Sequence, residues 1–195
     1  MSDINRDWEK VYEVEATPWD VGQPEDALVE FIGSGLVKPC RVLEIGCGNG
    51  NDAIFLAKKG FDVTAIDISK NAIENAKSRA KKAEVKCKFL VGDIIEIKHF
   101  PEIFEFVYDR GCFHFVPKNK REKYVEIVKK SLAKKGYFLL IVSSDKETPK
   151  GPYQFSKQDI KEIFGNDFDI LDIRLITLTQ HKEKPTPYLC TMKRK

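Results

Sequence analysis

Glycines and carboxylates stand at a regular spacing around two largely apolar runs early in the chain. Residues 41–45 suit a buried strand, residues 46–50 read GCGNG, and Asp67 directly follows a second such run, 61–66. Glycines after a strand let the backbone approach a ligand and point amide N–H groups at it. An acidic residue about 20 positions further on can hold the hydroxyls of a ribose. This stretch therefore predicts a site for a ligand that contains a nucleoside.

The glycine spacing separates two kinds of nucleoside ligand. The dinucleotide fingerprint is G-x-G-x-x-G, whereas the third glycine here, Gly50, comes one place early and Asn51 stands where the fingerprint has glycine. Glu44 lies inside the preceding strand. A carboxylate there would repel a pyrophosphate but suit a cationic ligand that carries an amino acid. A nicotinamide-dependent oxidoreductase is therefore disfavoured.

The pattern Glu44-x-Gly46-x-Gly48-x-Gly50, followed by Asp67, resembles the signature of class I S-adenosylmethionine-dependent methyltransferases. The resemblance implies that S-adenosyl-L-methionine is the cofactor and S-adenosyl-L-homocysteine its product. It assigns cofactor contacts to the first turn and the end of the second strand, namely Glu44, Gly46, Cys47, Gly48, Asp67 and Ile68. Taken alone, the glycines also fit a tight strand-to-helix turn that binds nothing.

A third strand, 85–91, ends in Gly92-Asp93-Ile94. In the methyltransferases that the chain resembles, an acid at this place commonly accepts a hydrogen bond from the adenine amino group. The resemblance therefore adds Asp93 and Ile94 to the cofactor site. A simple strand-end turn is the alternative reading of the same residues.

The loop after the fourth strand, 104–108, carries the residues that decide the chemistry, because open α/β sheets place ligands at the carboxyl ends of their strands. The loop has neither the Pro-Pro motif of nucleic-acid amino-methyltransferases nor a Pro-Cys pair. Asp109-Arg110-Gly111 instead resembles the pattern of thiopurine and thiol methyltransferases, in which the arginine lies beside donor and substrate. We expect Asp109 and Arg110 at the cofactor, and Arg110 and His114 as catalytic candidates. A local ion pair and a packed histidine remain the alternatives.

Aromatic residues precede the first strand, and Trp8, Tyr12 and Pro18-Trp19-Asp20 resemble the N-terminal lid of the thiopurine, thiol and halide methyltransferases, a group that includes tellurite-resistance methyltransferases. By this resemblance Trp19 belongs to the cofactor site, and Trp8 and Tyr12 to the substrate side. On their own, the two tryptophans read as packing residues. A long polar loop, 143–153, is expected to form a substrate-side wall that includes Tyr153.

The order of elements predicts an α/β protein with a three-layer, Rossmann-like methyltransferase fold. We expect a seven-stranded, mostly parallel sheet with an antiparallel C-terminal hairpin and helices on both faces. The remaining expected strands are 137–142, 168–178 and 186–192, and the expected helices are 24–33, 52–59, one from Ser69, one from Pro117 to Gly136, and 156–164. A single domain, 1–195, would comprise a lid and helix, 1–35, and a core, 36–195.

Composition and charge narrow the class of protein. Hydrophobic residues make up 42% and charged residues 32% of 195 residues, and the formal net charge of +3 is too mild to predict nucleic-acid binding. No apolar run is long enough for a membrane span, and the N-terminus lacks a signal-peptide core. Five cysteines without a C-x-x-C pair and three scattered histidines suggest neither a disulfide framework nor a metal site. We expect a cytoplasmic protein, compatible with a monomer.

These residues predict methyl transfer to a small, soft acceptor such as a thiol, a halide or a metalloid oxyanion. An already ionised soft nucleophile needs no strong general base, which fits a sequence without an obvious Cys–His or Ser–His pair. Arg110 would help to hold an anionic acceptor, and His114 or Tyr153 would be the proton acceptor if one is needed. A small-molecule O- or N-methyltransferase and a non-catalytic cofactor-binding module remain as alternatives.

Overall fold

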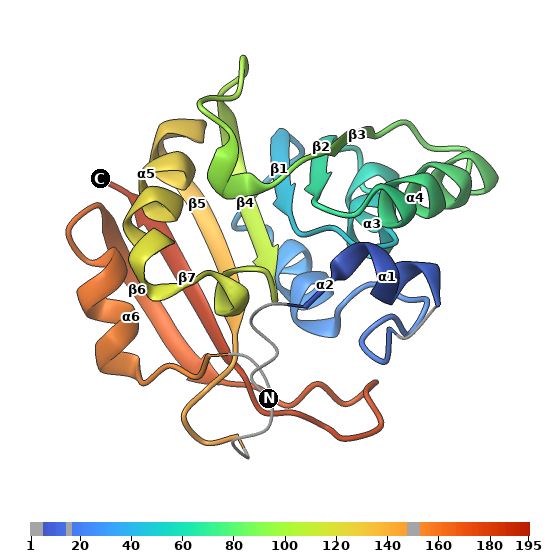
Figure 1. Ribbon diagram of the computed structural model, residues 1–195. Helices are drawn as coiled ribbons and strands as arrows, with labels where there is room; N and C mark the ends of the chain where they lie inside the picture. Colours follow the sequence, from blue (N-terminus) through green and yellow to red (C-terminus); the bar gives the residue numbers. More distant parts are fainter. Residues whose placement is uncertain (1–5, 15–16, 148–152) are drawn as a thin grey trace.

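A seven-stranded sheet separates two layers of helices in the computed structural model, which describes residues 6–14, 17–147 and 153–195 (Figure 1). Its strands are β1 Arg41–Ile45, β2 Asp62–Asp67, β3 Lys88–Val91, β4 Phe104–Arg110, β5 Leu132–Val142, β6 Phe168–Leu175 and β7 Tyr188–Arg194. Its α-helices are α1 Trp8–Glu13, α2 Asp26–Gly33, α3 Asn51–Lys58, α4 Lys70–Lys82, α5 Arg121–Ser131 and α6 Lys157–Phe164. Short 3-10 turns cover Ile94–Glu96, Phe113–Phe115 and Lys118–Lys120.

The strands lie in the order β3-β2-β1-β4-β5-β7-β6. The pairs from β3 to β5 are parallel, and β7 runs antiparallel between β5 and β6. This confirms the predicted fold class, including the antiparallel C-terminal pair. The strand order reverses between β1 and β4, and the carboxyl ends at such a switch point form the usual ligand crevice of an open α/β sheet.

Side chains that alternate along the central strands feed two cores. Val42 and Phe106 point into a core shared with α2, α3 and α4, whereas their neighbours Leu43 and Val107 point into one shared with α5 and α6. Both sets are fully buried. Burial on both faces explains why these strands read as nearly continuous apolar runs rather than as alternating ones.

Polar side chains cap the starts of α4 and α6, where the sequence predicts that these helices begin. The Ser69 hydroxyl accepts a hydrogen bond from Ala72 N at 3.1 Å, and Ile73 packs from α4 against the sheet. Ser156 and Asp159 form a reciprocal capping box at the start of α6. Each cap satisfies backbone N–H groups that would otherwise lack a partner.

Several element boundaries differ from the prediction. The strand expected at 168–178 ends at Leu175, and the strand expected at 186–192 spans Tyr188–Arg194. Two other differences have a clear structural cause. The helix expected to run from Pro117 to Gly136 ends at Ser131, because Leu132 already pairs with Phe104 and begins β5. The third strand begins at Lys88 rather than at residue 85, because the chain first leaves α4 through Glu84, which has φ +57°. Of the polar loop 143–153, residues 148–152 lie outside the described part.

Among the described residues no helix is long and apolar enough to cross a bilayer. Within the same part of the chain, no cluster of three or more His, Cys, Asp or Glu side chains is arranged to hold a metal ion.

Candidate active site

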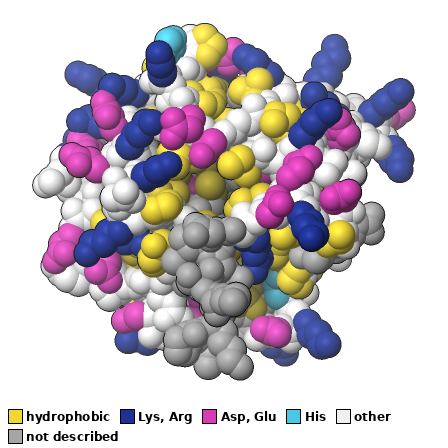
Figure 2. Space-filling model, in the orientation of Figure 1, with side chains coloured by type: hydrophobic (Ala, Val, Ile, Leu, Met, Phe, Trp, Pro, Cys, Tyr) yellow, Lys and Arg dark blue, Asp and Glu magenta, His cyan; other side chains and the backbone are white. Residues whose placement is uncertain are grey.

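A cleft of about 820 Å³ opens at the carboxyl ends of the parallel strands, beneath α1 and the segment that follows it. Its wall is formed by the turns after β1, β2, β3 and β4, by the loop after β5 and by the segment 178–187 before β7. In the view of Figure 2, hydrophobic side chains gather around the middle of this face, with charged side chains of both signs around them. The cleft therefore lies at the switch point of the sheet.

The turn after β1 is tight enough to require glycine. Gly46 and Gly48 have φ +69° and +51°, values that residues with a side chain rarely adopt. A methyl group added to Gly48 would lie 2.7 Å from Tyr12 Oη, and one on Gly46 would lie 2.7 Å from Cys112 Cβ. The turn thus presents bare backbone to the cleft.

Two buried carboxylates flank this turn. Asp67, at the end of β2, accepts hydrogen bonds from Gly48 N at 2.8 Å and from Ser69 N at 2.9 Å, and it lines the cleft. Glu44 lies behind the turn and does not line the cleft, and its Oε2 atom is buried with no hydrogen-bond partner among the described residues. Burial raises the pKa of both carboxyl groups above the ordinary values.

Aromatic rings of the lid close one side of the cleft. The Trp8 ring meets Phe115 edge to face at 4.7 Å between centroids and Trp19 at 5.8 Å. Trp19 Nε1 donates to Tyr12 Oη at 3.4 Å. The guanidinium of Arg6 lies 5.3 Å from the centre of the Trp8 ring. Four aromatic side chains from α1, the following segment and the β4 loop therefore form one wall.

Two polar clamps hold the lid against the core. Glu9 of α1 accepts from Ser69 Oγ at 2.7 Å. Asp20 accepts from Asn51 Nδ2 at 2.6 Å, from Asn49 Nδ2, and from the Arg79 guanidinium at 2.9 Å. Against the effect of burial, these hydrogen bonds lower the pKa of Asp20 to about 2. The clamps attach the lid to the start of α3 and to both the start and the last turn of α4.

Arg110, at the end of β4, lines the cleft and is held by two buried carboxylates. Its Nε donates to Asp52 at 3.0 Å, and its Nη1 lies 3.7 Å from Glu25. Tyr108 Oη also donates to Asp52, at 3.2 Å, and His181 Nε2 lies 3.6 Å from Glu25. This cluster joins β4, α3, the start of α2 and the segment before β7.

His114 lies in the same loop after β4, four residues beyond Arg110. It is neutral at pH 7, because burial lowers its pKa to about 3. Its Nδ1 accepts a hydrogen bond from Ser143 N at 3.2 Å and lies 3.2 Å from Ser143 Oγ. Ser143 belongs to the loop after β5, which also brings Glu147 to the cleft. Burial raises the pKa of the Glu147 carboxyl, opposed only in part by hydrogen bonds from Ser143 and the backbone.

The family model for thiopurine S-methyltransferase matches residues 4–188, nearly the whole chain. The chain belongs to the thiopurine S-methyltransferase family. It is an S-adenosylmethionine-dependent methyltransferase, and S-adenosylmethionine is its cofactor.

Among sequence relatives, a 2-heptyl-1-hydroxyquinolin-4(1H)-one methyltransferase of Mycobacteroides abscessus is 28% identical over 160 residues, which cover 80% of this chain and 70% of that protein. A probable thiol methyltransferase of Arabidopsis thaliana is 27% identical over 158 residues, with the same coverage. The named acceptors of these relatives differ in chemistry.

Solved structures show the same fold. One from work on the conversion of a disulfide bond into a thioacetal group during echinomycin biosynthesis has a TM-score of 0.80 at 23% identity and covers 91% of this chain and 85% of its own. TehB from Haemophilus influenzae has a TM-score of 0.72 at 22% identity, with coverage of 87% and 61%.

In this family member the cleft brings together most of the residues that the sequence predicts for the site. The predicted residues that line the cleft are Trp8, Tyr12, Trp19, Gly46, Cys47, Gly48, Asp67, Ile68, Asp93, Ile94, Arg110 and His114. Three others do not line it, namely Glu44, Asp109 and Tyr153. Their positions show what they contact instead.

Asp109 is fully buried and fixes the β4 loop from within. Its carboxylate accepts hydrogen bonds from Tyr124 Oη, from Cys112 N at 2.8 Å and from Phe113 N at 3.1 Å. Tyr153 packs against the guanidinium of Arg121, 4.6 Å from the ring centre. Asp109 therefore acts on the cleft through the loop that it shapes.

Several cleft residues escaped the sequence analysis. They are chiefly Arg6, Asn49, Asn51, Cys112, Phe115 and the segment 178–187. Ser143 and Glu147 lie in the loop 143–153 that was expected to form a substrate-side wall, but neither residue was singled out. Asn49 and Asn51 sit in the glycine turn itself, so their position was an available signal. Glu147 and the segment before β7 carry no motif, and only the fold brings them to the cleft.

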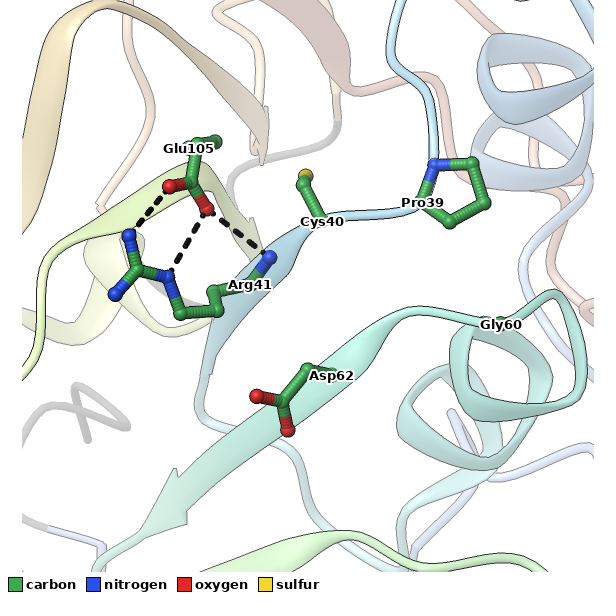
Figure 3. Close-up of a pocket in the computed structure, with 6 residues that line it drawn as sticks. All are labelled: Pro39, Cys40, Arg41, Gly60, Asp62 and Glu105. Atoms are coloured by element: carbon green, nitrogen blue, oxygen red, sulfur yellow. Dashed lines mark hydrogen bonds and ion pairs between the residues drawn. The ribbon is translucent and has the colours of Figure 1, made fainter.

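A second hollow, of about 430 Å³, lies at the other end of the sheet, where β1 and β2 begin (Figure 3). Arg41 and Glu105 join across it with an Nη2–Oε1 distance of 2.6 Å. Cys40 lies in this hollow, and burial raises the pKa of its thiol to about 11. A protonated thiol at the far end of the sheet has no access to the cleft.

Proposed function

We propose that the protein transfers a methyl group from S-adenosylmethionine to a small, soft acceptor, a class that includes thiols, halides and metalloid oxyanions. The observation that carries this proposal is the aromatic wall. Trp8, Trp19 and Phe115 line the cleft, and the centroid of the Trp8 ring lies 5.8 Å from that of Trp19 and 4.7 Å from that of Phe115. Polarisable sulfur makes favourable contacts with aromatic rings.

The side of the cleft that is formed by the turns after β1, β2 and β3 suits an aminoacyl nucleoside. In our proposal, Asp67 holds the ribose hydroxyls, and Asp93 and Ile94 hold the adenine. The bare backbone at Gly46 and Gly48 receives the amino-acid end. Glu44, with its unpartnered oxygen behind the turn, balances the positive charge of that end.

The cofactor supplies a methyl group on a positively charged sulfur, which is already a good leaving group. The protein therefore has to orient the acceptor and exclude water. The lid, held by Glu9 and Asp20, covers the cleft and serves the second task. His114 cannot act as a strong base at neutral pH because its pKa is about 3. This favours an acceptor that is acidic or already ionised over an alcohol or an amine.

Methylation of an oxygen or nitrogen in a small metabolite is the second candidate. It is favoured by the 28% identical relative, whose named acceptor is a hydroxyquinolone. Such a heterocycle would also stack against the aromatic wall. Only the choice of acceptor separates the two candidates.

The test is transfer of labelled methyl from S-adenosylmethionine to a panel of thiols, thiopurines, halides, thiocyanate, tellurite and arsenite, alongside phenols, hydroxyquinolones and amines. Reactions without an acceptor measure the background. We expect transfer to at least one soft acceptor. Transfer confined to oxygen or nitrogen acceptors, or to none of the panel, contradicts the proposal.

A further inference from the structure

Glu147 brings a carboxylate to the cleft, and this carboxylate neither holds the lid nor belongs to the proposed cofactor site. It is half-buried and lines the cleft with Ser143 and His114. Its carboxylate lies near the Ser143 side chain and near the backbone of Ser144 and Thr186. Ser143 Oγ lies in turn 3.2 Å from His114 Nδ1. The loops after β4 and β5 and the segment before β7 thus meet at this carboxylate.

The charges around Glu147 leave it unpaired. Across the described residues, no lysine, arginine or histidine forms an ion pair with it. On its own loop, Lys146 pairs with Asp145. Before β7, Lys182 and Glu183 are exposed at the cleft rim. On the β4 loop, His114 is neutral at pH 7.

The positive charge of Arg110 is already neutralised by its neighbours. The guanidinium of Arg110 lies between two carboxylates, 3.0 Å from Asp52 and 3.7 Å from Glu25. One positive charge against two negative charges leaves little attraction for an anion at Arg110, whereas Arg6, Lys120 and Lys182 line other parts of the cleft. An ordinary thiol has a pKa of about 8.5, so at pH 7 it enters mostly in its neutral form and has to lose its proton in the cleft.

We propose that Glu147 is the general base that takes this proton from a neutral thiol acceptor, an inference that rests on the proposed transfer to a soft acceptor. The S–H bond of the acceptor breaks and its proton passes to the Glu147 carboxylate. The acceptor sulfur forms a bond to the methyl carbon as the carbon–sulfonium bond breaks, and that electron pair stays on the departing, neutral thioether. Glu147 then returns the proton to water.

The acidity of a half-buried carboxylate suits it to accept a proton from a thiol. An ordinary thiol has a pKa of about 8.5, within reach of a carboxylate whose own pKa is raised, whereas an alcohol is far too weak an acid. A halide or an oxyanion needs no proton acceptor at all. The presence of Glu147 therefore narrows the acceptor class from soft nucleophiles to protonated thiols.

The test compares Glu147→Gln with the wild-type protein on two acceptors at neutral pH. One is 2-mercaptoethanol, which is protonated there, and the other is 4-nitrothiophenol, which is ionised. We expect kcat/KM to fall by about 100-fold or more on 2-mercaptoethanol, the usual contribution of a general base, and to stay near the wild-type value on 4-nitrothiophenol. Glu162→Gln, on the exposed face of α6, is the matched control and should change neither.

An equal loss on both thiols would show a structural role and overturn the inference, as would no loss on either. Absence of transfer from the wild-type protein to any thiol would instead sink the proposed function itself. The two failures are therefore distinguishable.

Measurements on the wild-type protein cover the case in which Glu147→Gln fails to fold. The pH profile of kcat/KM for 2-mercaptoethanol should level off below the pKa of the thiol. A rise in proportion to the thiolate up to that pKa overturns the inference. Calorimetry of 2-mercaptoethanol binding to the S-adenosylhomocysteine complex, in two buffers of different ionisation enthalpy, should show no proton release. Release of one proton would mean that the thiolate binds, and would also overturn it.

Discussion

The Asp20 carboxylate ties the lid to the core, and its neutralisation is expected to speed release of the cofactor. It accepts hydrogen bonds from Gly22 N at 3.0 Å, from Asn51 Nδ2 at 2.6 Å, from Asn49, and from Arg79 at 2.9 Å. Asp20→Asn keeps the size of the side chain. It removes the charge and replaces one acceptor oxygen by an amide group that cannot accept.

The size of the effect follows from these contacts. A hydrogen bond to a charged group contributes about 1.5–3 kcal/mol. Arg79 is partly exposed, so its share is smaller. We take a value just below this range, about 1.4 kcal/mol, which is a tenfold change in the equilibrium between closed and open lid. If release requires opening, the dissociation rate constant of S-adenosylhomocysteine rises about tenfold, and the dissociation constant rises by that factor or less.

The chain offers a direct signal for this assay, because its two tryptophans, Trp8 and Trp19, both belong to the lid. Stopped-flow tryptophan fluorescence after rapid dilution of the complex gives the dissociation rate constant. Asp62→Asn, at the exposed start of β2, is the matched control. A dissociation rate constant that is the same in Asp20→Asn, Asp62→Asn and the wild-type protein would refute the clamp.

Two further predictions concern stability. The contribution of His114 to the unfolding free energy should fall by about 1.6 kcal/mol from pH 6.5 to about pH 5, because the unfolded chain takes up a proton on His114 there while the folded protein, with a His114 pKa of about 3, does not. Asp109 opposes this fall in the whole protein, because its raised pKa of about 7 makes the folded state take up a proton over the same range. Because Asp109 acts in both proteins, urea titrations should show that the unfolding free energy of the wild-type protein changes by about 1.6 kcal/mol less favourably over this range than that of His114→Gln; equal changes in the two proteins contradict it. Arg110→Met should lower the unfolding free energy by about 3–5 kcal/mol, since it leaves Asp52 and Glu25 buried without their cation. The exposed pair of Arg41 should contribute far less, and an Arg110→Met loss no larger than that of Arg41→Met would argue against a buried ion cluster.

The parts of the site that the sequence predicts are those where backbone geometry dictates the residue. Gly48 is required because any Cβ would meet Tyr12, and Asp67 is placed by the end of a strand. Such constraints are local, so spacing along the chain reveals them. The central strands of the sheet can be predicted for the same reason, since strands buried on both faces read as continuous apolar runs.

The remaining parts depend on contacts between segments that are distant in sequence. Asp20 looks like any turn residue until α3 and α4 bring Asn51 and Arg79 to it. Glu147 stands in a polar loop with no motif, and its raised pKa comes from burial that only the folded chain produces. The end of the helix before β5 was mispredicted likewise, because pairing of Leu132 with Phe104 outweighs a local pattern that continues to Gly136.

The most direct test of the cofactor site is calorimetric titration of the wild-type protein and of Asp67→Ala with S-adenosylhomocysteine, with NADH as the comparison ligand and thermal unfolding to verify that the variant folds. Asp67 is buried, lines the cleft and holds the glycine turn through Gly48 N. The account predicts that the wild-type protein binds S-adenosylhomocysteine and not NADH, and that folded Asp67→Ala binds it at least tenfold more weakly, a loss of about 1.4 kcal/mol or more. Equal affinity in the two proteins, or binding of NADH in place of S-adenosylhomocysteine, would contradict it.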